Sequence, residues 1–186
     1  MERMLLGTDE LTSDIVESGI VDWKDLVRTV RQFHYGRNSN REDFTLVWSE
    51  RKGTCSSKHA FLKLVAELNG FDTIQLFIGI YKMNSQNTPG VKDVLDTLKL
   101  SYIPEAHCYL KVDGEELDAT NLKSEFNNYR TDVLEEILIE KEVVVSEKID
   151  LHKKFIRNWI ENEQVPHSFD EIWELREQCI LALEKR

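Results

Sequence analysis

Residues 53–70 have the sequence GTCSSKHAFLKLVAELNG, and this stretch sets the expectation for the fold. Thr54 is a suitable N-cap residue, and Gly70 is a suitable residue just beyond the C-terminal end of a helix. The apolar residues between them recur at helical spacing and form a wide stripe that consists of Ala60, Phe61, Leu64, Val65 and Leu68. The stretch therefore predicts a buried helix over residues 55–69 that has Cys55 in its first turn.

Cys55 stands where a thiol can become a nucleophile. The thiolate is the reactive form, and the pKa of a thiol falls near the N-terminus of a helix and beside an imidazolium ion. Gly53 lacks a side chain, so we expect it to leave space for a substrate backbone. A lone cysteine at a helix start is nevertheless more often a small buried apolar residue. A catalytic role for Cys55 therefore requires a base and a group that orients the base.

Residues 106–120 predict a β-hairpin. Two extended runs flank Asp113 and Gly114, and an Asp-Gly pair between such runs is typical of a two-residue turn. This turn pairs Leu110 with Leu117. A three-residue turn with a bulge would shift the pairing by one residue and exchange the two faces of the second strand.

In the two-residue register, His107 and Asp118 are diagonal neighbours on the polar face of the hairpin. Diagonal partners lie roughly 7–8 Å apart between their backbones, which is within side-chain reach. A carboxylate at this position can hold one tautomer of an imidazole and stabilise the imidazolium. The alternative is that Asp118 ends the strand and bonds to nearby backbone groups. His59 lies one turn after Cys55, but its ring would lie along the helix, so we expect a packing or surface role for it.

Three motifs resemble, in this order along the chain, the core of the transglutaminase-like superfamily. They are Gly53-Thr54-Cys55 at a helix start, Glu105-Ala106-His107, and Leu117-Asp118-Ala119-Thr120, within residues 41–121. The resemblance implies an α+β fold of the papain type, in which a central helix that carries the cysteine packs on an antiparallel sheet, with flanking N- and C-terminal helices. It also implies that Cys55 is the nucleophile, His107 the general base and acid, and Asp118 the residue that orients the histidine.

In this family, an upstream tryptophan or glutamine often joins the backbone N–H of the cysteine in the oxyanion hole. Trp48 is the candidate here, and a role as a core aromatic residue is the alternative. The sequence departs from the family where Cys108 and Tyr109 follow His107, and where Leu117 stands in place of an aromatic residue. These departures leave the substrate class open.

The reaction that the resemblance implies is acyl transfer through a thioester on the cysteine. Water as the acceptor gives a peptidase or amidase, and an amine gives a transglutaminase; the small size and the lack of a secretion signal favour hydrolysis. The expected substrate is a peptide, a protein or a small amide, and no metal or organic cofactor is expected. The alternatives are a catalytically inactive module that binds protein in the same groove, and a transferase that uses a carrier-bound acyl group.

Composition disfavours several other classes of function. Hydrophobic residues make up 41% and charged residues 31% of the chain, which is typical of a folded globular protein. With 34 acidic against 24 basic residues and no long basic run, a nucleic-acid partner is not expected. The sequence lacks a bilayer-spanning apolar stretch and a signal-peptide pattern, so no membrane partner is expected. Three widely spaced cysteines argue against disulfides and for a reducing, cytoplasmic compartment.

The remaining segments complete an α+β pattern. Apolar periodicity predicts strands over residues 73–81 and 135–145, and helices over residues 23–33, 41–50, 91–100 and 149–160, with a capping box at 168–171 that opens a last helix. Residues 1–145 are then expected to form the transglutaminase-like core with N-terminal helices. Residues 146–186 are expected to form a C-terminal helical extension that packs on this core, and self-association is left open.

Cysteines and histidines outside the triad are expected to be structural. Cys108 and Cys179 fall on apolar faces of their predicted elements and belong in the core. No spacing typical of a metal site relates His34, His152 or His167 to a second ligand.

Overall fold

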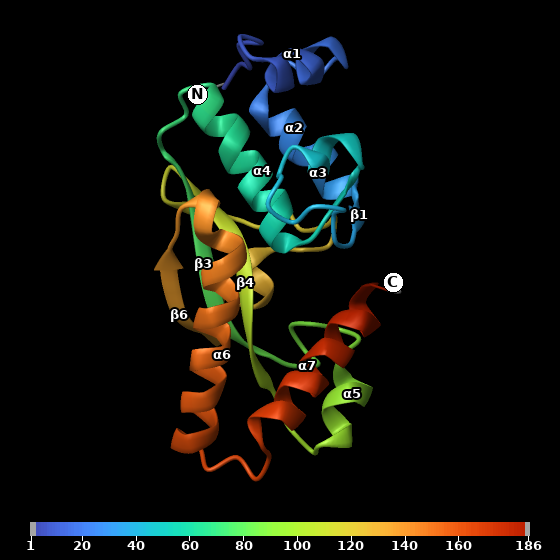
Figure 1. Ribbon diagram of the computed structural model, residues 1–186, viewed down its shortest axis with the longest axis vertical. Coiled ribbons are helices and arrows are strands. Elements are labelled where there is room, and N and C mark those ends of the chain that lie inside the picture. The colour runs from blue at the N-terminus through green and yellow to red at the C-terminus, as the bar shows by residue number, and fades with distance from the viewer. Residues whose placement is uncertain (1–2, 185–186) are drawn as a thin grey trace. The chain divides into compact units, whose positions relative to one another are not determined.

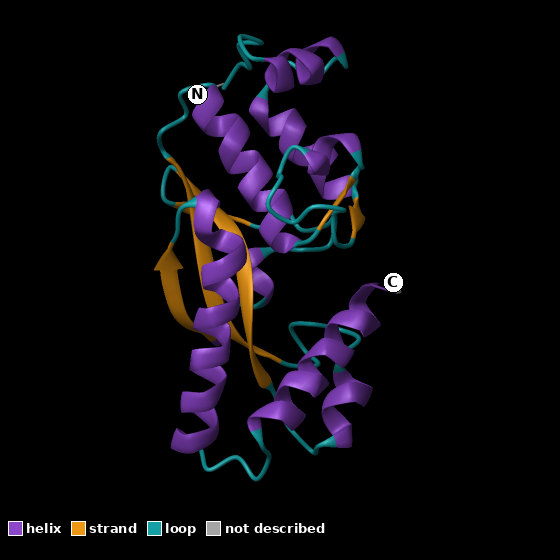
Figure 2. Ribbon diagram, viewed as in Figure 1, coloured by secondary structure: helices purple, strands orange, loops and turns teal. Residues whose placement is uncertain are grey.

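A computed structural model describes residues 3–184 of the chain, and the fold is mixed α and β, with an antiparallel sheet and helices (Figures 1 and 2). The helices are α1 (Glu10–Glu17), α2 (Trp23–Gln32), α3 (Leu46–Ser49), α4 (Cys55–Leu68), α5 (Lys92–Thr97), α6 (Val144–Asn162) and α7 (Phe169–Glu184). The strands are β1 (His34–Tyr35), β2 (Lys52–Gly53), β3 (Ile74–Met83), β4 (Ile103–Val112), β5 (Glu115–Leu117) and β6 (Val133–Leu138). Short 3-10 helices are η1 (Phe126–Asn128), η2 (Arg130–Asp132) and η3 (Lys141–Val143).

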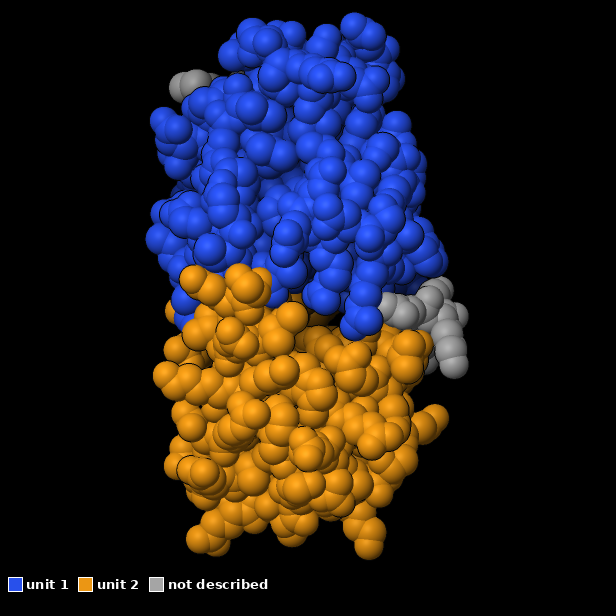
Figure 3. All heavy atoms as spheres, in the orientation of Figure 1, with its two compact units in different colours: residues 1–78, 108–126, 137–145 blue, residues 79–107, 127–136, 146–186 orange. Residues whose placement is uncertain are grey.

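The chain forms two compact units, which are coloured separately in Figure 3. Unit 1 contains the described residues up to Ile78 together with Cys108–Phe126 and Ile137–Val145. Unit 2 contains Gly79–His107, Asn127–Glu136 and the described residues from Ser146 onwards. Strands β3 and β4 therefore each contribute residues to both units. The predicted C-terminal extension begins where the chain passes from unit 1 to unit 2, and it shares unit 2 with parts of the predicted core.

The hairpin predicted around residues 113–114 is present, and its register is confirmed as far as Leu117. The predicted second strand extended to residue 120, but β5 ends before Asp118. Strands β4 and β5 pair antiparallel, with Val112 opposite Glu115 and Leu110 opposite Leu117. Asp113 has a φ of 53° and Gly114 a φ of 88°, the two positive values that a two-residue hairpin turn of this type requires. The four-stranded sheet has the order β5-β4-β3-β6, so the chain crosses from one edge strand to the other after β5.

Helix α4 begins and ends close to where the capping residues predict. The side chain of Thr54 accepts a hydrogen bond from the backbone N–H of Ser57, and the Ser57 hydroxyl in turn accepts from the backbone N–H of Thr54. Gly70 follows the helix with a φ of 70°. The helix contacts α1, α2, α3, β2 and η3, so most of its circumference is buried. This burial holds the start of the helix, and Cys55 with it, in a fixed place.

The predicted starts of two other helices, α2 and α7, are confirmed by their capping residues. Asp22 caps α2 through its carboxylate, and Ser168 and Glu171 form the predicted capping box at α7. The predicted helix over 41–50 is confined to α3, and the predicted helix over 91–100 is confined to α5. Helix α1, which follows Asp9 as its N-cap, was not predicted.

The strand predicted over residues 135–145 is wrong in its second half. Strand β6 ends at Leu138, η3 follows, and α6 begins at Val144. The β-branched residues there favour a strand locally, but Val144 is fully buried as a helical residue, and Lys141 forms an ion pair with Glu67 of α4 at 2.6 Å. Tertiary contacts therefore override a local β preference.

Unit 2 contains a buried ionic cluster. The guanidinium of Arg176 on α7 donates to both carboxylate oxygens of Glu105 on β4, at 2.9 and 2.7 Å. His152 on α6 lies beside them, with its Nε2 2.8 Å from the carbonyl oxygen of Pro104. Burial would raise the pKa of Glu105, but the charges of Arg176 and His152 lower it below its ordinary value.

Candidate functional site

Cys55 is the first residue of α4 and the most exposed of the three cysteines. Its exposed fraction is 6%, whereas Cys108 and Cys179 are 0% exposed. The first turn of a helix carries unsatisfied N–H groups and the positive end of the helix dipole, both of which favour an anion. The predicted position of Cys55 is therefore confirmed, and the thiol lies at the end of the helix where a thiolate is stabilised.

His59 is a structural histidine that fastens the start of α4 to the segment after β5. Its Nε2 accepts a hydrogen bond from the backbone N–H of Ala119 at 2.7 Å. Because an amide can only donate, the ring proton resides on Nδ1, which donates to the carbonyl oxygen of Cys55 at 2.7 Å. Both ring nitrogens are therefore used within unit 1, and the predicted packing role is confirmed.

Asp118 lies in the same network, directly after β5. Its side chain is 2% exposed, and one carboxylate oxygen accepts a hydrogen bond from the backbone N–H of Thr120 at 2.9 Å. The same oxygen lies 3.7 Å from Nε2 of His59. The local backbone bond is the one that the alternative interpretation predicts. It is also compatible with an orienting role, because a carboxylate has about four acceptor sites.

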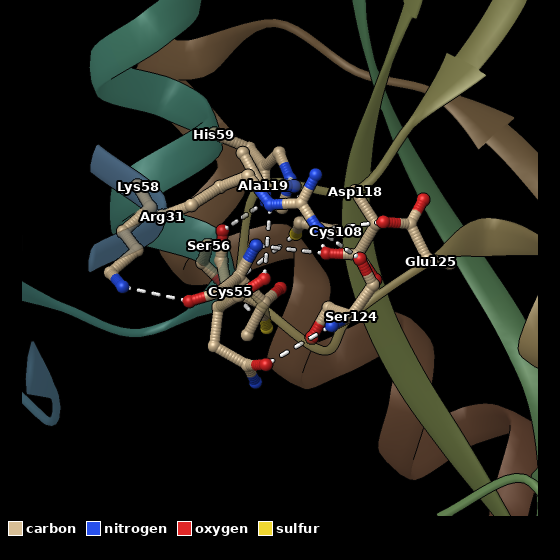
Figure 4. A network of polar contacts seen from close by, with 12 residues as sticks. Arg31, Cys55, Ser56, Lys58, His59, Cys108, Asp118, Ala119, Ser124 and Glu125 are labelled. Carbon is tan, nitrogen blue, oxygen red and sulfur yellow. Dashed lines mark hydrogen bonds and ion pairs between the residues drawn. The ribbon is translucent and has the colours of Figure 1, made fainter. Parts of the chain in front are cut away.

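Lys58 is the residue that the sequence analysis missed. Its side chain is 0% exposed, and its Nζ donates to the carbonyl oxygens of Phe33 and Thr120, each at 2.7 Å. Figure 4 shows Lys58 together with Cys55, His59 and Asp118. Burial lowers the pKa of Lys58 to about 8, although the nearby charges of Asp118 and Cys55 act to raise it. Its spacing offered a signal, because a residue three positions after Cys55 and four before Leu62 lies on a helix face that the core covers.

Arg31 of α2 secures the loop that continues from Asp118. Its guanidinium donates to three backbone carbonyls of this loop, those of Asn121, Leu122 and Ser124. It also forms an ion pair with Glu125 at 2.7 Å. Two cations, Arg31 and Lys58, thus hold successive parts of the loop after β5 against helices α2 and α4.

Gly53 does not leave space for a substrate, contrary to the prediction. A Cβ atom at this position would lie 2.9 Å from Cγ of Lys58 and 2.9 Å from Oγ of Ser57. The space beside Gly53 is therefore occupied by the lysine stem and the capping serine. The glycine is needed for this close packing, and the approach of a substrate would have to use another side of Cys55.

Trp48 is a core aromatic residue, in line with the alternative to an oxyanion role. Its indole N–H donates to the carboxylate of Asp14 at 2.6 Å, and its exposed fraction is 4%. The guanidinium of Arg51 lies 3.6 Å from the centre of its ring. The indole N–H that an oxyanion hole would require already donates to Asp14 inside unit 1.

His107 is the last residue of β4 within unit 2. Its half-buried ring makes edge-to-face contacts with Tyr81 and Tyr129, at centroid distances of 6.2 and 5.4 Å. The next residue, Cys108, belongs to unit 1 and is fully buried there, as predicted. Its thiol donates to the hydroxyl of Ser56 at 3.5 Å. The structure thus brings Cys55 and Asp118 into one network of unit 1 and places His107 in unit 2.

No protein-family model, curated protein or solved structure matches the chain. Within residues 3–184, no group of three or more His, Cys, Asp or Glu side chains is arranged to hold a metal ion. None of the helices in this part of the chain is both long and apolar enough to cross a membrane.

Proposed function

We propose that this chain is a cysteine-dependent acyl-transfer enzyme with a transglutaminase-like, papain-type core. Cys55 is the nucleophile, His107 the general base and acid, and Asp118 the residue that orients the histidine. The observation that carries the proposal is the fastening of residues 118–120 to the first turns of the helix that begins with Cys55. The helix start that carries the thiol and the segment that carries a buried carboxylate are thereby joined by hydrogen bonds, which supports a thiol site at this place.

The proposed reaction has two halves. The Cys55 thiolate attacks the carbonyl carbon of an amide or ester, and the backbone N–H of Cys55 receives the negative oxygen. His107 gives a proton to the leaving amine or alcohol, and a thioester of Cys55 forms. His107 then takes a proton from water or an amine, which attacks the thioester and releases the acid or the new amide together with the thiolate.

The residues around Cys55 and around His107 support this proposal. Ser56 and Cys108, which adjoin Cys55 and His107 in the sequence, are hydrogen-bonded to each other within unit 1. The rings of Tyr81 and Tyr129 restrict the rotation of His107 within unit 2. A peptide, protein or small amide is the proposed substrate, with water favoured as the acceptor.

The test is the pH dependence of alkylation by iodoacetamide, followed by mass spectrometry at each cysteine. Burial raises the pKa of the Cys179 thiol to about 12, so this residue stays protonated and serves as the internal reference. We expect Cys55 to react fast below pH 8 in the wild type and to lose this reactivity in His107→Ala. His34→Ala, which removes an exposed histidine of β1, is the matched control and should react like the wild type.

A second measurement reads the covalent step directly. Incubation with an activated ester should leave an acyl group on Cys55 that is detectable in the intact protein, and Cys55→Ser should not form this thioester. If Cys55 reacts no faster than Cys179 at any pH below 8, and no acyl group is found, the enzyme hypothesis is wrong. The inactive protein-binding module then takes its place.

A further inference from the structure

Lys58 is buried in a way that calls for an explanation. It is completely inaccessible to solvent, yet it is paired with no carboxylate of the described part of the chain, and its hydrogen bonds go to two backbone carbonyls. A buried cation is usually paired or functional, because removing a charge from water is unfavourable. A methionine or leucine would fill the same space beside Gly53 without this penalty, so packing does not account for the amine.

The position of Lys58 relates it to both Cys55 and Asp118. Side chains three residues apart on a helix have Cβ atoms about 5–6 Å apart, so Lys58 and Cys55 are neighbours on one face of α4. The carbonyl that Lys58 binds belongs to Thr120, two residues after Asp118. Its second acceptor, Phe33, follows α2 and directly precedes β1. The amine of Lys58 therefore connects α4 to the residue that follows α2 and to the segment that follows β5.

The charged and titratable groups of the surrounding elements determine how this amine behaves. Cys55 and His59 are on α4, Asp118 follows β5, Arg31 is on α2 and Lys52 is on β2. His59 is held neutral by its two backbone contacts, and Arg31 is occupied by the loop after residue 120. The charges that act on Lys58 are those of Asp118 and Cys55, and both favour its protonated form.

We propose that Lys58 is a positioning residue of the Cys55 site: its ammonium group holds residues 118–120 against the first turns of α4 and supplies the positive charge that favours the thiolate of Cys55. The inference rests on the proposed function, because it assigns Lys58 a role in preparing that nucleophile. The amine does not touch substrate and donates no proton in the reaction. Its contribution is electrostatic and geometric, and it adds to that of the helix N-terminus.

The test measures the pKa of the Cys55 thiol. The ultraviolet absorbance of the thiolate is followed against pH, and the absorbance of the matching Cys55→Ser protein is subtracted. We expect Lys58→Met to raise this pKa by about one unit, because an adjacent positive charge is lost. Lys63→Met is the matched control. Lys63 lies on the same helix and pairs with Glu67, about 12 Å along the axis from Cys55, so its removal should shift the pKa far less.

A reciprocal measurement uses a protein that keeps Lys58. Coupling between two sites acts equally in both directions, so the loss of the thiolate should lower the pKa of Lys58. Nuclear magnetic resonance of the lysine Nζ in the wild type and in Cys55→Ser reads this shift, and it remains decisive if Lys58→Met does not fold. An unchanged Cys55 pKa in a folded Lys58→Met protein, or an unchanged Lys58 pKa in Cys55→Ser, would overturn the inference.

The outcomes separate this inference from the proposed function. If Lys58→Met raises the Cys55 pKa while His107→Ala leaves alkylation unchanged, the coupling between Lys58 and Cys55 is upheld and the triad is wrong. If His107→Ala abolishes alkylation while Lys58→Met has no effect on the pKa, the triad is upheld and Lys58 is only a structural residue.

Discussion

Units 1 and 2 each bury a basic side chain, and they neutralise it in different ways. In unit 2, Arg176 makes a bidentate ion pair with Glu105, and the charge of this carboxylate raises the pKa of the guanidinium in spite of its burial. In unit 1, Lys58 has only carbonyl oxygens as partners, and burial lowers its pKa to about 8. The first cation keeps its charge at any pH that the fold survives, whereas the second titrates near neutral pH.

The difference indicates which cluster is structural and which is suited to chemistry. In a bidentate ion pair the carboxylate already compensates the charge of the guanidinium. The protonation state of the pair therefore changes little when another charge appears nearby. A lysine without a carboxylate partner leaves part of its charge uncompensated, so the thiolate of Cys55 and the carboxylate of Asp118 can each interact with it. Strongly perturbed pKa values beside a thiol mark candidate functional sites for the same reason.

The largest effect is expected from opening the ion pair of unit 2. Arg176→Met leaves Glu105 as a buried charge with one strong partner removed, and breaking such a pair is expected to lower the free energy of unfolding by about 3–5 kcal/mol. Urea denaturation followed by circular dichroism measures this loss. The control is Arg176→Met combined with Glu105→Gln, which removes both charges and should restore at least half of the stability. Equal stabilities of the single and double variants would contradict the description of this pair.

A smaller effect on stability is expected from the cation of unit 1. Lys58→Met leaves the carbonyls of Phe33 and Thr120 without this donor, but it breaks no direct ion pair, and it removes an amine that burial disfavours. We expect a loss of about 1–3 kcal/mol in the same denaturation experiment. Lys63→Met, which opens a partly exposed ion pair on α4, should lower the stability by less than about 0.5 kcal/mol. If Lys58→Met lowers the free energy of unfolding as much as Arg176→Met does, the two buried cations do not differ in how their charge is neutralised.

The parts of the fold that the sequence predicted are those with local causes. Thr54 caps α4 through a residue three positions away, and residues 113 and 114 set the hairpin register by their own backbone angles. The start of the helix at Cys55 and the pairing of Leu110 with Leu117 could both be inferred in this way. Each of these features depends on residues within one turn of a helix or one hairpin.

The parts that were missed depend on partners far along the chain. The acceptors of Lys58 lie 25 and 62 residues away in the sequence, and the amide that binds His59 lies 60 residues away. No local pattern predicts such partners, so the spacing of Lys58 could indicate that the residue is buried but not which groups it binds. Gly53 was misinterpreted for the same reason, since its neighbour in space is the stem of Lys58. The helical structure from residue 141 onwards was likewise missed, because η3 contacts α4, which lies far away in the sequence.

The smallest expected effect, the pH dependence of stability, tests the central difference between the two cations. The folded-state pKa of Lys58 is about 8, below the ordinary value of 10.5 that the unfolded chain retains. Between these values the unfolded state binds more protons, so the free energy of unfolding must rise with pH. For this single group, linkage gives an increase of about 1 kcal/mol between pH 7 and pH 9.

The wild type and Lys58→Met should therefore differ in slope over this range. Both proteins carry Cys55→Ser in this comparison, because Lys58→Met is expected to shift the pKa of that thiol and its titration would not cancel. The stability advantage of the wild type over Lys58→Met should grow by about 1 kcal/mol from pH 7 to pH 9. Comparison of the wild type with Arg176→Met combined with Glu105→Gln should show no such change, because the guanidinium does not titrate there. Parallel pH profiles for the wild type and Lys58→Met would mean that Lys58 keeps an ordinary pKa, and the contrast between the two buried cations would then disappear.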